Sequence, residues 1–181
     1  MNEECLEKKR VIDKKQRIFF RVSAAINLLF IGVIAWGMFK MNFVKEQVLL
    51  TEVQTNLVEL EGLIAHQINN DWSNPNLVTT ELGDVLDGIL LGITIGEQLG
   101  TLSNADKKTL LSLYSKFNYY PNDELYRFVD VTDEDKRNFE KLREMLREVG
   151  LGLGITISGN MDYFIKQAQE LDRKIQSSLN Q

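Results

Sequence analysis

The sequence predicts an all-α protein in which an N-terminal transmembrane helix is followed by an antiparallel four- or five-helix bundle. Three observations lead to this prediction. One apolar run near the N-terminus is long enough to cross a bilayer. After it, apolar residues recur at spacings of three and four, as in amphipathic helices. Strand-like alternation between hairpin turns does not occur in the 181 residues.

The apolar run extends from Val22 to Phe39 without a charged residue. At ~1.5 Å per residue it covers about 27 Å, close to the ~30 Å hydrocarbon core of a bilayer. With its apolar flanks it predicts an anchor at residues 18–43, after a basic tail at 1–17 and before a helical domain at 44–181. A cleaved signal peptide is the alternative reading. The run is longer than a usual signal core and continues past the small residues Ala35 and Gly37.

The cationic residues indicate the orientation of this anchor. Seven Lys or Arg residues precede the run from Val22 to Phe39, whereas Lys40 and Lys45 are the only ones between the end of this run and Lys107. Because cationic flanks are retained in the cytoplasm, we expect a cytoplasmic N-terminus and an outer C-terminal domain in a single-pass protein of the cell membrane.

Charge also separates the two parts of the chain. Residues 1–40 hold eight Lys/Arg and four Asp/Glu, and the remaining residues hold thirteen and twenty-two, which gives net charges of +4 and −9. An acidic domain repels phosphate backbones, so nucleic acid is not an expected partner. The short basic tail suits an anionic membrane lipid surface.

Start and stop signals predict the helices of the outer domain. An apolar stripe from Val44 to Ile68 predicts a first helix, continuous with the anchor and ending near residue 70. After the break DWSNPNLVT, Thr79 or Thr80 is the expected cap of a second helix over residues 80–100. Ser103 is the expected cap of a third helix that ends near residue 118, and Thr132 that of a fourth.

The second predicted helix contains a glycine every four residues. A glycine inside a helix costs about 1 kcal/mol relative to alanine, so we expect a neighbouring helix to pack closely there. A second set of small residues could form a matching face. The expected helix-packing glycines are Gly88, Gly92, Gly96, Gly100, Gly150 and Gly154.

The segment GLGLGITISG, residues 150–159, is expected to break the helix, as a kink or as a loop, before a final helix from Asn160 to Leu179. A single helix from Thr132 to Leu179 would be about 70 Å long, far longer than its neighbours. The pentapeptide LGITI occurs at 91–95 and again at 153–157, which indicates either an old duplication or a chance recurrence.

Residues able to perform chemistry are few. His66 is the only histidine and Cys5 the only cysteine, so no multi-histidine zinc site, no internal disulfide and no cofactor is predicted. Asp84 and Asp87 share a face of the glycine-rich helix and form a candidate acidic pair; a solvated helix face is the alternative. The alternation of Glu and Arg between residues 140 and 148 predicts a solvated face.

Aromatic residues gather in two predicted loops, which should lie at the same end of the bundle. They form either a partner surface or a plug over the bundle end. The residues are Trp72, Tyr119, Tyr120, Tyr126 and Phe128.

The leading functional hypothesis is a membrane-anchored interaction or assembly protein without evident catalysis, whose partner is another membrane or envelope protein or a second copy of the chain. A ligand-binding or sensory outer domain is the first alternative, and it predicts a pocket between the second and fifth helices of that domain. A carboxylate-dependent envelope hydrolase is the second, and it predicts a cleft in which Asp84 or Asp87 meets a carboxylate from elsewhere.

Overall fold

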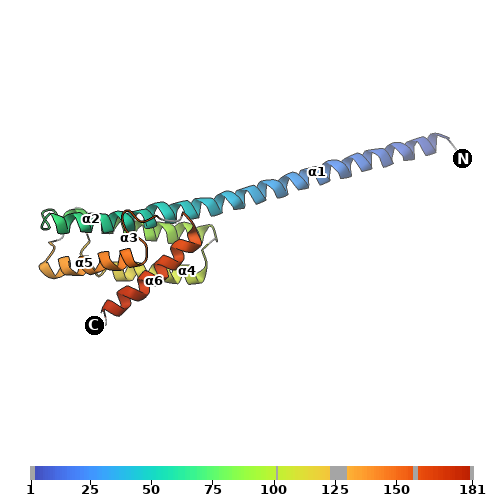
Figure 1. The fold of residues 1–181 in the computed structure, drawn as a ribbon. Coiled ribbons are helices and arrows are strands. Elements are labelled where there is room, and N and C mark those ends of the chain that lie inside the picture. Colours follow the sequence, from blue (N-terminus) through green and yellow to red (C-terminus); the bar gives the residue numbers. More distant parts are fainter. Residues whose placement is uncertain (1–2, 101, 123–129, 157–158, 180–181) are drawn as a thin grey trace. The chain divides into compact units, whose positions relative to one another are not determined.

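In the computed structural model, the described residues are 3–100, 102–122, 130–156 and 159–179, and this part of the chain is helical without strands. Its elements are α1 (Glu3–Val48), the π-helix η1 (Leu49–Thr55), α2 (Asn56–Asn69), α3 (Asn76–Gln98), α4 (Asn104–Phe117), α5 (Asp133–Glu148) and α6 (Met161–Leu179) (Figure 1). The chain divides into two compact units, Met1–Met41 and Asn42–Gln181.

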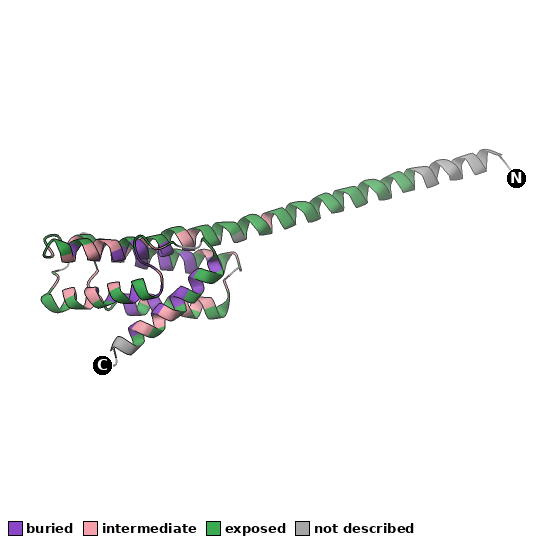
Figure 2. Cartoon of the chain, in the orientation of Figure 1, coloured by how far each residue is buried: buried purple, intermediate pink, exposed green. Residues whose placement is uncertain are grey.

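The described apolar side chains of the first unit are exposed. Between Lys15 and Met41 every residue is exposed except the half-buried Gly37 (Figure 2). Phe19, Phe20 and Phe39 are 75, 76 and 70% exposed. Apolar surface left in water costs about 25 cal/mol per Å² in free energy, so this exposed helix is costly if water surrounds it. By length and composition, this helix near the N-terminus could span a membrane.

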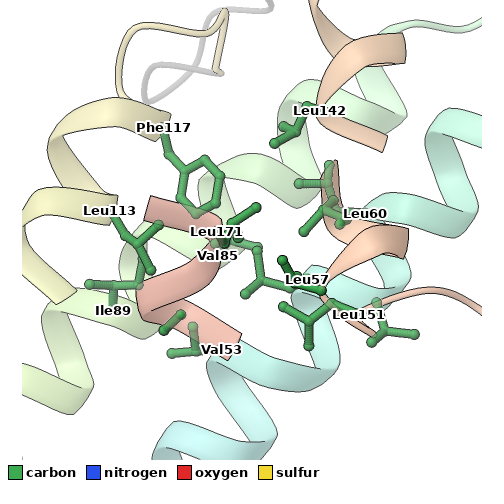
Figure 3. Close-up of a cluster of buried hydrophobic side chains, with 14 of the residues drawn as sticks. Val53, Leu57, Leu60, Val85, Ile89, Leu113, Phe117, Leu142, Leu151 and Leu171 are labelled. Carbon is green, nitrogen blue, oxygen red and sulfur yellow. The ribbon is translucent and has the colours of Figure 1, made fainter. Parts of the chain in front are cut away.

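The second unit is built around one hydrophobic core. α2 packs against α3 and α5, α4 packs against α3 and α6, and η1 packs against α3 and α6. Each of these elements contributes fully buried side chains to the same cluster. The labelled core residues in Figure 3 are Val53, Leu57, Leu60, Val85, Ile89, Leu113, Phe117, Leu142, Leu151 and Leu171.

Two predicted helix caps are confirmed and one is wrong. The Ser103 and Thr132 side chains accept hydrogen bonds from the backbone N–H groups of Asp106 and Asp135, and Thr132 forms a complete capping box. The second helix begins at Asn76, with Pro75 at its cap, rather than at Thr79 or Thr80. Proline is favoured at helix starts because its φ is already helical and its missing N–H leaves no donor unsatisfied.

The π-helix was not predicted. Its residues Leu49 and Val53 are fully buried, and Gln54 beside them is nearly so. The wider turn brings an extra residue to the buried side, which the three-and-four pattern of an α-helix does not anticipate. The amphipathic stripe therefore predicted helix here correctly, but not its type.

The predicted break after residue 149 is confirmed. α5 ends at Glu148, and Gly150 has a φ of +80°. The N–H of Leu151 bonds the carbonyl of Leu146 and that of Gly150 bonds Arg147, the pairing of a Schellman motif. Residues 91–95 lie inside α3, whereas 153–156 form a non-helical connection, so the first four residues of the repeated pentapeptide have two different structures.

Candidate functional surfaces

Two glycines of α3 lie against η1. A Cβ on Gly88 would lie 2.2 Å from the carbonyl oxygen of Glu52, and one on Gly92 would lie 2.2 Å from a methyl carbon of Leu49. At Gly88 the obstacle is backbone, which cannot rotate away as a side chain can. These two glycines therefore let α3 and η1 approach at backbone distance.

The other glycines have different roles. A Cβ on Gly96 would lie 2.7 Å from that of Leu102, so Gly96 accommodates the turn after α3. Gly100 lies beyond the end of α3 with a φ of +61° and nothing near its Cβ position, so it is not a helix-packing residue. Gly150 and Gly154 also have positive φ and lie outside the helices. The second small-residue helix face is therefore a wrong prediction: these glycines allow turns.

A buried carboxylate fixes the connection between α5 and α6. Glu61 is 1% exposed; its Oε1 lies 2.9 Å from Arg143 Nε and 3.2 Å from Arg147, and its Oε2 accepts the N–H of Leu153 at 2.7 Å. One carboxylate thus joins α2, α5 and the following connection. The solvated face predicted for α5 is wrong at half-buried Arg143, whose side chain extends to an acid in the core, whereas Arg147 reaches the same acid from an exposed position.

A pair of buried amides joins η1 to α6. The side-chain amide of Gln54 donates to the oxygen of Gln167 at 3.0 Å, and the amide of Gln167 donates to the Val149 carbonyl at 3.0 Å. Both side chains are almost fully buried. Near the other end of α6, the ammonium of Lys116 lies 2.8 Å from a carboxylate oxygen of Asp172 and donates to the Asp172 carbonyl at 2.6 Å. Polar pairs in the core therefore fix the position of α6 on the domain.

Two of the predicted surface aromatics are folded inward. The rings of Trp72 and Tyr120 lie 6.1 and 5.5 Å from the buried ring of Phe139, and the indole N–H of Trp72 donates to Glu140. Burial raises the pKa of Tyr120 to about 12. Two arrangements were predicted, a partner surface or a plug, and these two side chains adopt the plug.

The remaining aromatics differ. Tyr119 is 76% exposed and is available to a partner. Tyr126 and Phe128 lie outside the described residues.

The turn that carries Trp72 has positive φ at Asp71 and Trp72, and the Gln67 carbonyl accepts the Trp72 N–H at 2.8 Å. Buried Gln67 also accepts the N–H of Asn74 through its side chain. This turn is a fixed structural feature.

Asp84 and Asp87 line an open hollow between η1 and α3. The hollow has a volume of about 700 Å³, and Glu52 of η1 also lines it. Leu90 and Leu91, which are 40 and 46% exposed, form its apolar part. The structure therefore brings the predicted acidic pair together with a third carboxylate from another element.

The acidic character continues along α2 and α3 to Glu59 and Glu81. Burial, reinforced by the carboxylates of Glu59 and Asp84, raises the pKa of Glu81 to about 7. One oxygen of Glu81 is buried without a hydrogen-bond partner among the described residues. None of the ion pairs found in that part of the chain involves these five carboxylates. The negative charge on this face is thus uncompensated within the described residues.

Metal and histidine chemistry has no visible site. His66 is exposed and contacts the side chain of Asn70, four residues away. Within the described ranges, no group of three or more His, Cys, Asp or Glu side chains is placed to hold a metal ion. The carboxylates near Asp84 therefore do not form such a group within the described ranges.

The residues that sequence reasoning missed are Glu61, Gln54 and Gln167. Glu61 lies four residues after Leu57 and three before Ile64, on the buried stripe of its helix. A lone acid at such a position was the available signal, because a buried carboxylate requires a cationic partner. Gln54 is buried by the π-turn, which the sequence pattern did not reveal.

No family model, no curated protein and no solved structure matches this chain. The function proposed below therefore rests on the chain's own residues.

Proposed function

We propose that the chain is a single-pass membrane protein whose outer helical domain works through contacts with another protein. The observation that supports it best is the exposed apolar helix between Lys15 and Met41, whose side chains are buried only if lipid surrounds them. The cationic residues before it favour a cytoplasmic N-terminus and an outer C-terminal domain.

The outer domain offers surfaces that suit a protein partner. Exposed apolar side chains on separate elements include Leu91 of α3, Leu111 of α4 and Tyr119 after α4. The helices below them are fixed by the core and by buried polar pairs. A rigid domain that displays apolar residues among charges has the composition of a docking surface.

The hydrolase alternative has one observation in its favour. Its expected cleft, with Asp84 and Asp87 opposite a second carboxylate, corresponds to the hollow that Glu52 also lines. Against it, all three carboxylates are exposed, and Glu81, whose raised pKa would suit a general acid, is not among the residues that line the hollow. A site open to water lacks the environment that strengthens charge interactions in catalysis.

The sensory alternative predicts a pocket between α3 and α6, whereas the second hollow, of about 480 Å³, lies between α4 and α6 and is lined by Ser112, Ser115, Lys116, Tyr119 and Gln176. Its one cation, Lys116, already pairs with Asp172. The remaining polar groups give this hollow little with which to select a ligand.

Native electrophoresis of detergent-solubilised membranes tests the proposed function. We expect the full chain in a complex that contains another polypeptide, and we expect the complex to persist when the membranes are crosslinked before solubilisation. The proposal is contradicted if the chain migrates as a lone monomer both with and without crosslinking.

A further inference from the structure

The hollow between η1 and α3 combines apolar and acidic side chains in one place. We define the acidic groove as this hollow, with Glu52 on the η1 side, and Asp84, Asp87, Leu90 and Leu91 on the α3 side. Its floor is formed where Gly88 meets the backbone of Glu52, so no side chain from α3 fills it at that point. The groove is thus a consequence of the close helix approach.

Charge indicates what the groove accepts. The three carboxylates of its rim have no ion pair among the described residues, and exposed Glu59 adds a further negative charge on α2. A cation placed here gains attraction without displacing a cation already bound there. The exposed leucines add apolar surface beside the charges.

We infer that the acidic groove is the docking site for a cationic amphipathic segment of another protein. The inference rests on the proposed function, because it supplies the partner surface. A segment that presents Lys or Arg beside apolar side chains matches both the acidic rim and the leucines.

Two other occupants fit less well. A single metal ion would need several ligands converging on one point, and within the described ranges no such group exists. A second copy of the outer domain carries the same net charge of −9 over residues 41–181, so two copies repel. The chain's own basic tail, in the proposed topology, lies on the other side of the membrane.

The test places a photo-crosslinking amino acid at Leu91 of the full-length chain in the membranes of its own cells. Leu91 is exposed, so the label leaves the core intact. We expect an adduct whose partner peptide contains Lys or Arg and comes from another protein. The pair Asp84→Asn and Asp87→Asn should reduce the adduct at least fivefold. The control pair Glu144→Gln and Asp162→Asn, on exposed faces of α5 and α6, should change it less than twofold.

Other outcomes overturn the inference: no adduct, an adduct with a second copy of the chain, one with a neutral or acidic segment, or equal yields in the two variant pairs. The same label at Leu111 and at Tyr119 separates the two proposals. An adduct at either position without one at Leu91 contradicts the groove but leaves the proposed function intact. No adduct at any of the three contradicts both.

Discussion

The carboxylate of Glu61, on α2, accepts a hydrogen bond from the backbone N–H of Leu153 at 2.7 Å. The two residues are 92 positions apart, and the bond fixes a connection that contains two glycines with positive φ. Because the same carboxylate contacts Arg143 and Arg147, it joins α2 to α5 and to the connection that follows α5.

Glu61→Gln should therefore destabilise the outer domain by about 2–4 kcal/mol, since it leaves two guanidinium groups without their buried partner. Urea unfolding of the full chain in detergent micelles measures this loss of stability. The experiment uses a Trp36→Phe background, in which Trp72 is the only tryptophan and its fluorescence reports the unfolding of the outer domain. Exposed Glu59→Gln, two residues away, is the control and should change the free energy of unfolding by less than about 0.5 kcal/mol. Equal effects of the two substitutions would show that the buried carboxylate is not a structural anchor.

Gly88→Ala should destabilise the domain by about 1–3 kcal/mol, because its Cβ would overlap the carbonyl oxygen of Glu52 and force α3 and η1 apart. Gly83, in the same helix, has nothing within 4 Å of its Cβ position. Gly83→Ala should therefore stabilise the domain by about 0.5–1 kcal/mol. Thermal unfolding of both variants checks the opposite signs, and two stabilising substitutions would refute the close approach.

Helix positions were largely predictable because local signals decide them. The side chains of Ser103 and Thr132 cap helices from within a few residues, and Gly150 ends a helix through its own φ. The π-helix was not predictable, because its extra residue per turn is stabilised by packing against Gly88 and Gly92, about 40 residues away. Such contacts depend on tertiary structure and leave no local pattern.

Gln167→Leu should cost about 1–3 kcal/mol, because it removes the donor to the Val149 carbonyl and the acceptor for Gln54 in the core. Gln169→Leu, at an exposed position of the same helix, is the matched control and should stay within about 0.5 kcal/mol. Chemical unfolding at pH 7 compares them. A Gln167→Leu variant as stable as the control would remove the amide pair from the account of how α6 is held.

The free energy of unfolding should fall as the pH rises from about 4.5 to about 7, through the contribution of Glu81. The pKa of Glu81 in the folded domain is raised above its ordinary value of 4.5, so the folded domain binds more protons than the unfolded chain in this window. Because the carboxyl is partly exposed, solvent screening limits the effect to about 1 kcal/mol.

Glu81→Gln isolates this contribution, since the difference between the wild-type and variant unfolding curves removes the other titrating groups. The difference should change across pH 4.5–7 and be constant above pH 8. A difference that is flat across the whole range would mean that burial and the carboxylates of Glu59 and Asp84 do not raise the pKa of Glu81.

The candidate site was predictable only in part. Asp84 and Asp87 share a helix face, and spacing alone finds such pairs. Their neighbour Glu52 comes from η1, so the sequence could not place it beside them. For the aromatics, composition located the loops, but the ring of Phe139 on α5 determines that Trp72 and Tyr120 fold inward.

The topology of the chain is the central claim, and protease accessibility tests it most directly. Intact cells with a permeable outer layer are treated with protease, and a tag on residue 181 and another on residue 1 are followed in the carbonate-resistant membrane fraction. We predict loss of the C-terminal tag and survival of the N-terminal tag. Recovery of the full-length chain in the soluble fraction, or protection of the C-terminal tag until the membrane is broken, would contradict the account.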